Sequence, residues 1–107
     1  MANALGYVSE TDIGYKGELA MIGLSTPIRI LLNADKTAPN QPDFRIFAGE
    51  AKTEIGAAWL KQAKSSGRDY ISLTLATPEI GPRKIYASLA PIKGSDGRHV
   101  IRWNPKD

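Results

Sequence analysis

Basic and aromatic side chains alternate along the second half of the chain, a pattern typical of surfaces that bind nucleic acid. Lysines and arginines neutralise phosphates, and exposed tyrosines offer flat faces on which bases stack. The candidate nucleic-acid-binding residues are Lys61, Lys64, Arg68, Tyr70, Lys84 and Tyr86. The two tryptophans, Trp59 and Trp103, are expected to anchor the core of a small domain instead. The sequence therefore predicts a basic outer surface suited to a polyanion.

Few residues could carry catalysis or hold a metal ion. His99 is the single histidine and cysteine is absent, which excludes a conventional structural zinc site and a cysteine nucleophile. The carboxylate pairs Asp35/Asp43 and Glu50/Glu54 flank expected turns. Turn chemistry or solvation at the surface explains the presence of these residues better than acid–base catalysis does. The sequence motifs of nucleotide-binding loops and of hydrolases are missing. We therefore expect a non-enzymatic protein with no catalytic residues, no metal and no cofactor.

The charge is uneven along the 107 residues, whose formal net charge is +3. Residues 1–53 hold five basic and six acidic side chains, net −1, and residues 54–107 hold nine and five, net +4. With 42% hydrophobic and 23% charged residues, the composition fits one globular domain over residues 1–107. No apolar run approaches the roughly 20 residues of a membrane span, and no signal peptide is evident. We expect a soluble, cytoplasmic protein that does not contact a membrane.

Short segments bounded by glycine and proline predict strands rather than long helices. Residues that alternate between apolar and polar side chains mark the strands. The expected strands are Leu5–Val8, Tyr15–Ile22, Pro27–Asn33, Phe44–Ala48, Asp69–Ala76, Lys84–Leu89 and His99–Trp103. Ile-Gly pairs at 13–14, 22–23, 55–56 and 80–81 are expected to mark bulges or strand ends. This spacing favours antiparallel meanders and hairpins.

The segment EIGAAWLKQAK, which begins at Glu54, fits helical and strand periodicity about equally well. The turn residues at 64–68 decide between them, because they let this segment fold back on the clear strand that begins at Asp69. We therefore predict a β-hairpin over residues 54–75.

Several further motifs carry a resemblance to a known family. PDFRIFAG (42–49), EIGAAW (54–59), GRDYISLTL (67–75), KIYASL (84–89) and YKGEL (15–19) resemble the family of small bacterial proteins called domain of unknown function 736. The resemblance implies a short cytoplasmic protein that is often carried on plasmids and conjugative elements. It supplies no catalytic or binding residues.

These observations predict an all-β protein, a small antiparallel barrel or two-layer sandwich of 6–8 strands with at most a short helical turn. The leading hypothesis is an accessory protein of a mobile genetic element that binds DNA or RNA weakly through a basic β surface. The alternative is a protein-binding module or inhibitor. It would act on a host, conjugation or defence protein through a sheet edge or the 37–43 loop.

Overall fold

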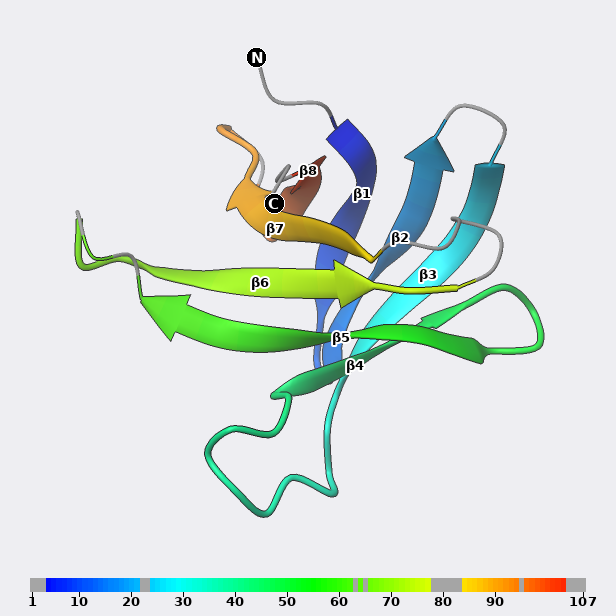
Figure 1. The fold of residues 1–107 in the computed structure, drawn as a ribbon. Coiled ribbons are helices and arrows are strands. Elements are labelled where there is room, and N and C mark those ends of the chain that lie inside the picture. Colours follow the sequence, from blue (N-terminus) through cyan, green and yellow to red (C-terminus); the bar gives the residue numbers. More distant parts are fainter. Residues whose placement is uncertain are drawn as a thin grey trace.

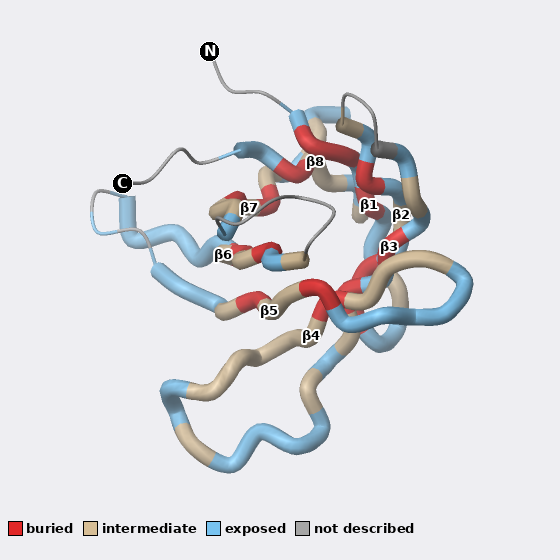
Figure 2. The backbone as a smooth tube through the Cα atoms, turned by 45° about the vertical axis from the view of Figure 1, so that its right-hand side comes forward, coloured by how far each residue is buried: buried red, intermediate tan, exposed pale blue. Residues whose placement is uncertain are grey.

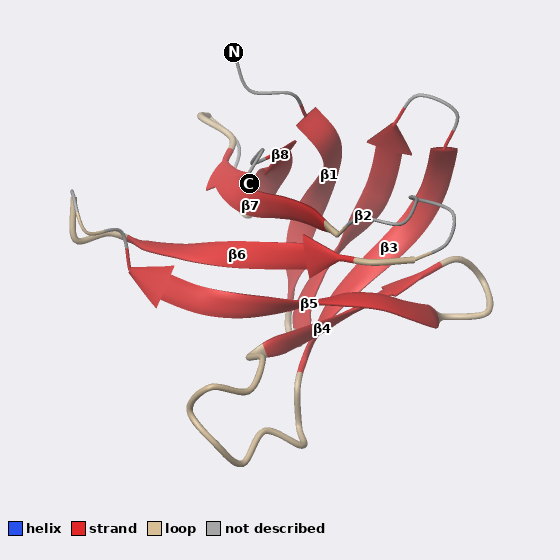
Figure 3. Cartoon of the chain, viewed as in Figure 1, coloured by secondary structure: helices blue, strands red, loops and turns tan. Residues whose placement is uncertain are grey.

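Eight strands make up the regular structure of the described residues. The computed structural model describes residues 4–21, 24–62, 64, 66–77, 84–94 and 96–103, and this part contains no helix (Figure 3). The strands are β1 (Ala4–Thr11), β2 (Gly14–Met21), β3 (Leu24–Leu32), β4 (Phe44–Ala48), β5 (Thr53–Gln62), β6 (Asp69–Leu75), β7 (Ile85–Pro91) and β8 (Arg98–Trp103). The prediction of an all-β fold with at most a short helical turn is confirmed for the described residues.

The strands form a closed barrel in which each is antiparallel to the next in sequence (Figure 1). β1 closes the barrel by pairing with β8, for example Tyr7 opposite Val100. The sequence had left barrel and sandwich open, and the pairing of the first strand with the last selects the barrel. Closure leaves no whole strand unpaired along its length, so a free sheet edge among the described residues is restricted to strand ends that extend past their neighbours, as at the end of β5 and the start of β6. Within the described chain, no helix is long and apolar enough to cross a membrane.

The hairpin predicted over residues 54–75 is present as β5 and β6. These strands pair from Gly56 opposite Leu75 to Gln62 opposite Asp69. The Gln62 side chain donates a hydrogen bond of 2.7 Å to the carbonyl of Gly67, and Gly67 has a φ of 72°. Glycine adopts this left-handed conformation without the steric cost of a Cβ. The turn chemistry thus explains why this segment is a strand despite its ambiguous periodicity.

The core fills the barrel interior with aliphatic side chains. Buried positions alternate with more exposed ones along the strands (Figure 2). The largest fully buried side chains are Leu19, Ile30, Ile46, Leu73, Leu75, Ile101 and Val8. The expectation that both tryptophans anchor this core is wrong. Trp103 is 42% exposed at the end of β8. Trp59 is half-buried, and its indole donates to the carbonyl of Asn40 in the 33–43 loop, outside the barrel core.

Two of the Ile-Gly pairs lie at a strand end and beside a bulge or register irregularity, as predicted. Gly14 begins β2 with a φ of 151°, and Gly56 adjoins a register irregularity between β4 and β5. A Cβ on Gly56 would lie 2.0 Å from the carbonyl oxygen of Thr74, so the two backbones approach more closely than any other residue type permits. The pairs at 22–23 and 80–81 lie outside the described residues, as does Ile22 of the expected strand Tyr15–Ile22.

Candidate nucleic-acid interface

The end of the β5–β6 hairpin projects from the barrel as a two-stranded ribbon. Pairing of β6 with β7 stops at Ile71 opposite Leu89, whereas β5 and β6 continue to pair through Lys61 opposite Tyr70 and Gln62 opposite Asp69. The extension beyond β7 is visible in Figure 1. We call residues 61–70 the β5–β6 ribbon. Its end is free of other strands on both sides, since pairing of β4 with β5 reaches only Ala58.

Four of the six predicted residues gather on this ribbon. Lys61, Lys64 and Arg68 are exposed, and Tyr70 is 37% exposed opposite Lys61. Within the described part of the chain, none of the three cations forms an ion pair. Asp69 is the one carboxylate among the described residues of the ribbon. Three positive charges less one negative charge leave a local excess of +2, with one aromatic face beside it.

The remaining two predicted residues lie elsewhere on the barrel wall. Tyr86 is half-buried opposite Thr74 of β6, and Lys84 is exposed just before β7 begins. Four residues separate Tyr70 from Thr74, which is about 13 Å along a strand. Lys84 and Tyr86 therefore cannot act at one compact site with the tip of the β5–β6 ribbon.

Cations beside the 33–43 loop are engaged by carboxylates, in contrast to those of the ribbon. Asp43 forms an ion pair with Lys36 and accepts a hydrogen bond of 2.8 Å from the Leu60 backbone. Nε of Arg45 donates to Glu54 at 2.9 Å. These contacts hold the loop against β5 and leave Lys36 and Arg45 less available to an external anion.

The same contacts shift the ionisation of Asp43 in the loop and of Glu54 in β5. Hydrogen bonds from the Lys36 ammonium and then from the Leu60 amide lower the pKa of Asp43. Hydrogen bonding to Arg45 lowers the pKa of Glu54, and the same bond raises the pKa of Arg45. Both carboxylates are therefore held in the charged form, which fits a structural role for Asp43 in the loop and for Glu54 between β4 and β5.

A second set of unpaired cations was missed in the sequence. Lys16 lies opposite Ser9 on one side and Arg29 on the other, and Ser9 in turn lies opposite Arg98. Among the described residues, Lys16, Arg29 and Arg98 form no ion pair. They come from β2, β3 and β8, so only the strand register brings them into one row. The signal available in the sequence was the alternation of each strand, which places these residues on its polar face.

Comparison with known proteins places the chain in a family. The family model described as "Protein of unknown function (DUF736)" matches residues 4–106. The protein belongs to the DUF736 family. The resemblance drawn from the sequence motifs is thereby confirmed. No curated protein and no solved structure matches the chain.

The single histidine of this DUF736 chain lies against an aromatic ring inside one end of the barrel. The ring centroids of His99 and Tyr15 are 5.2 Å apart in an edge-to-face arrangement. The ring centroids of Tyr15 and Phe44 are 6.1 Å apart. Burial, with a smaller effect of Glu10, raises the pKa of Tyr15. Nδ1 of His99 is buried and has no hydrogen-bond partner among the described residues. The described residues also contain no group of three side chains able to hold a metal ion.

Proposed function

We propose that the protein binds nucleic acid through the β5–β6 ribbon, without catalysis and without a cofactor. The observation that carries the proposal is the ribbon itself. It projects beyond the neighbouring strands and displays Lys61, Lys64 and Arg68, three cations with no carboxylate partner in the described structure. Unpaired cations can neutralise phosphates without first breaking an internal ion pair, so their full charge is available to a polyanion.

The shape of the ribbon favours a duplex as its partner. The major groove of B-DNA is about 12 Å wide and admits a two-stranded β-ribbon. Lys61, Lys64 and Arg68 would then contact phosphates at the groove edges, with Tyr70 beside them. Phosphate contacts fix the position of a protein on the duplex but read no sequence. We therefore propose weak binding with little sequence preference.

A setting for this activity is suggested by the family resemblance, which implies proteins that are often carried on plasmids and conjugative elements. Small basic proteins of such elements act in an environment rich in DNA. We propose an accessory protein of a mobile genetic element that acts in the cytoplasm. Its residues 54–107 carry the positive charge, net +4, and include the whole ribbon.

Binding titrations at two salt concentrations test the proposal. Fluorescence anisotropy with labelled duplex DNA, duplex RNA and single strands is expected to show binding at low salt that weakens steeply at moderate salt. The ionic contacts at the ribbon are the physical reason for this dependence. Absence of binding to all of these ligands at low salt would contradict the proposal.

A protein-binding role is the second candidate, and the apolar end of the barrel beside the 33–43 loop favours it. Ile13, Leu32 and Leu60 are exposed, the Leu32 amide donates to the Ile13 carbonyl, and Leu60 adjoins Asp43 of the loop. The loop would supply the polar part of such an interface and these side chains the apolar part. A stoichiometric partner that survives high salt and is lost on the double change Leu32→Ser and Leu60→Ser would support this role. Retention of that partner by the double variant would exclude this surface.

A further inference from the structure

A continuous row of outward-facing side chains crosses five neighbouring strands on the barrel wall. Residues directly opposite one another place Arg98 of β8, Ser9 of β1, Lys16 of β2, Arg29 of β3 and Phe47 of β4 in this order. We call this set the outer row. Adjacent strands lie about 4.8 Å apart, so the four steps of the outer row span about 19 Å. The centre of the outer row lies opposite β6, because β2 and β6 are four strands apart in either direction around the eight-stranded barrel.

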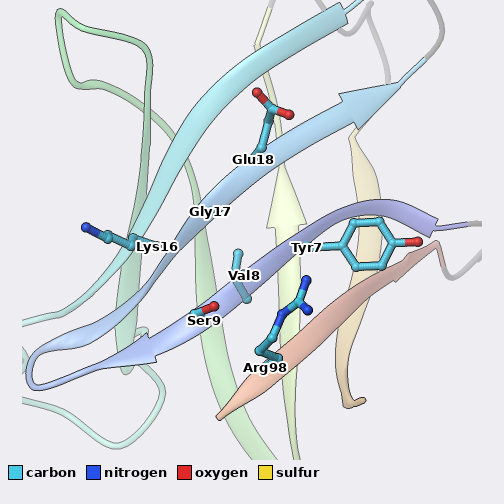
Figure 4. A pocket seen from close by; sticks show the side chains of 7 residues that line it. All are labelled: Tyr7, Val8, Ser9, Lys16, Gly17, Glu18 and Arg98. Atoms are coloured by element: carbon cyan, nitrogen blue, oxygen red, sulfur yellow. The ribbon is translucent and has the colours of Figure 1, made fainter. Parts of the chain in front are cut away.

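Shallow hollows occur at both ends of the outer row. The first is lined by Tyr7, Val8, Ser9, Lys16, Gly17, Glu18 and Arg98 and has a volume of about 260 Å³. Figure 4 shows the guanidinium of Arg98 between the side chains of Ser9 and Tyr7, with Lys16 on the far side of Ser9. The second hollow is lined by Pro27, Arg29, Phe47, Gly49, Glu50 and Lys52 and has a volume of about 270 Å³. Both volumes fall below the roughly 300 to 1,000 Å³ of small-molecule pockets, which favours an extended ligand that lies across the surface.

Each hollow combines an aromatic ring with cations. Tyr7 is 49% exposed and lies in the first hollow with Lys16 and Arg98. Phe47 is half-buried in the second hollow beside Arg29, directly opposite it on the neighbouring strand. The guanidinium of Arg45 lies over the Phe47 ring at 5.6 Å from its centroid, so one part of this ring is already covered. Tyr7 is therefore the more accessible of the two rings.

The charge of the outer row favours an anion. The hollows contain Lys16, Arg29, Lys52 and Arg98 on the basic side and Glu18 and Glu50 on the acidic side, a net charge of +2. None of these six side chains forms an ion pair within the described chain. Glu18 lies opposite Tyr7, two residues along the strand from Lys16 of the outer row. Within the outer row itself, Ser9 lies between Arg98 and Lys16, and no carboxylate lies between any two of the cations Arg98, Lys16 and Arg29.

We propose that the outer row is a binding track for single-stranded nucleic acid. Arg98, Lys16 and Arg29 would hold the backbone, and Tyr7 would stack on a base, with Phe47 as a second contact. Four stacked nucleotides extend about 14 Å, and more when the bases are splayed, which matches the row and the lower end of site sizes on small barrels. A duplex hides its bases from such rings, so stacking selects single strands. The inference rests on the proposed nucleic-acid binding but uses the opposite wall from the β5–β6 ribbon.

Anisotropy titrations of two ligands separate the two surfaces. The probes are a labelled oligothymidylate of about 12 nucleotides and a labelled duplex of similar length. Tyr7→Ala is expected to weaken binding of the single strand between about fivefold and about a hundredfold, whereas Tyr7→Phe keeps a ring and binds like wild type. The triple variant Lys16→Ala, Arg29→Ala and Arg98→Ala is expected to reduce the salt slope for the single strand by about 2. Duplex binding stays at the wild-type level in all three variants.

The ribbon variant Lys61→Glu, Lys64→Glu and Arg68→Glu is the matched control. It is expected to lose the duplex and to retain the single strand. The inference is overturned if wild-type protein binds the oligothymidylate and both Tyr7→Ala and the triple variant Lys16→Ala, Arg29→Ala and Arg98→Ala bind it equally well, an outcome that leaves the ribbon proposal intact. The inference is also overturned if the ribbon variant loses single-strand binding and the outer-row variants keep it. Binding of neither ligand by wild type contradicts both proposals. Far-UV circular dichroism verifies that each variant is folded.

Discussion

Lys61 of β5 and Tyr70 of β6 lie directly opposite each other on the outer face of a ribbon that extends past its neighbouring strands. This pair places a phosphate-binding charge beside an aromatic side chain, with about 5 Å between their Cβ atoms. Its position at a free end, rather than in the barrel wall, allows the pair to enter a groove. The relationship connects the chemistry predicted from the sequence with the shape found in the structure.

Charge reversal on the β5–β6 ribbon is expected to leave the fold intact. Lys61, Lys64 and Arg68 are exposed and form no ion pair among the described residues, so changing all three to Glu removes no stabilising contact. Exposed substitutions of this kind usually alter stability by about 0.5 kcal/mol or less each. Thermal unfolding should therefore show a midpoint within about 8 °C of wild type. A variant that fails to fold would show that these residues are structural.

Substitution of Gly56 tests how the barrel bends. A Cβ at this position lies 2.0 Å from the Thr74 oxygen and 3.1 Å from the Leu75 Cα, and both are backbone atoms of the paired strand. Gly56→Ala must separate β5 from β6, and overpacking of this kind typically costs about 1–3 kcal/mol. Chemical denaturation measures the loss.

Gly67→Asn is the control for the Gly56 variant. No atom lies within 4 Å of a Cβ at Gly67, and asparagine tolerates its left-handed backbone. This control is expected to lose well under about 1 kcal/mol. Equal stability of Gly56→Ala and wild type would contradict the close backbone approach.

The 33–43 loop is expected to depend on Trp59. The indole donates a hydrogen bond of 3.2 Å to the Asn40 carbonyl, and Trp59→Phe removes this bond while keeping an aromatic ring. A hydrogen bond of this kind contributes about 0.5–1.5 kcal/mol. Hydrogen exchange measured by mass spectrometry should show faster exchange in the loop and unchanged exchange in β2 and β3. Unchanged loop exchange would mean that Asp43 and Leu60 hold the loop without the indole.

Stability should fall in acid because of Asp43 and Glu54. The pKa of Asp43 and that of Glu54 are lower in the folded protein, where Lys36, the Leu60 amide and Arg45 stabilise the charged forms. Their contribution is full above the unfolded pKa values, near 4, and is lost as the pH falls through the lowered folded values. Denaturant titrations at pH 7 and near pH 3 measure this change in the free energy of unfolding. The double variant Asp43→Asn and Glu54→Gln should show a smaller decrease, and an unchanged decrease would contradict the assignment.

The strands could be predicted where alternation and turn chemistry agree. Phe44–Ala48 was predicted with the observed bounds, and the strand at Asp69 differs by one residue at its end. The turn after Gln62 resolved the helix-or-strand ambiguity because it lets two adjacent segments pair. Local sequence carries this information, since both partners of the hairpin lie within about 20 residues.

Closure and register lie beyond the reach of local patterns. Pairing of Tyr7 with Val100 joins the two ends of the chain, and the row from Arg98 through Lys16 to Arg29 exists only once that pairing is known. Trp59 was assigned to the core because its size suits a core anchor. Its alternation places it on the outer wall, where the 33–43 loop covers it. Both results depend on contacts between residues far apart in sequence.

The most direct test of the central claim is the salt dependence of duplex binding. For wild type, the logarithm of the association constant should fall linearly with the logarithm of salt concentration, with a slope of about −2.7 for three phosphate contacts. The variant Lys61→Glu, Lys64→Glu and Arg68→Glu should show no measurable binding. The outer-row variant Lys16→Ala, Arg29→Ala and Arg98→Ala should keep the wild-type slope. Duplex binding by the ribbon variant with the wild-type affinity and slope would contradict the claim.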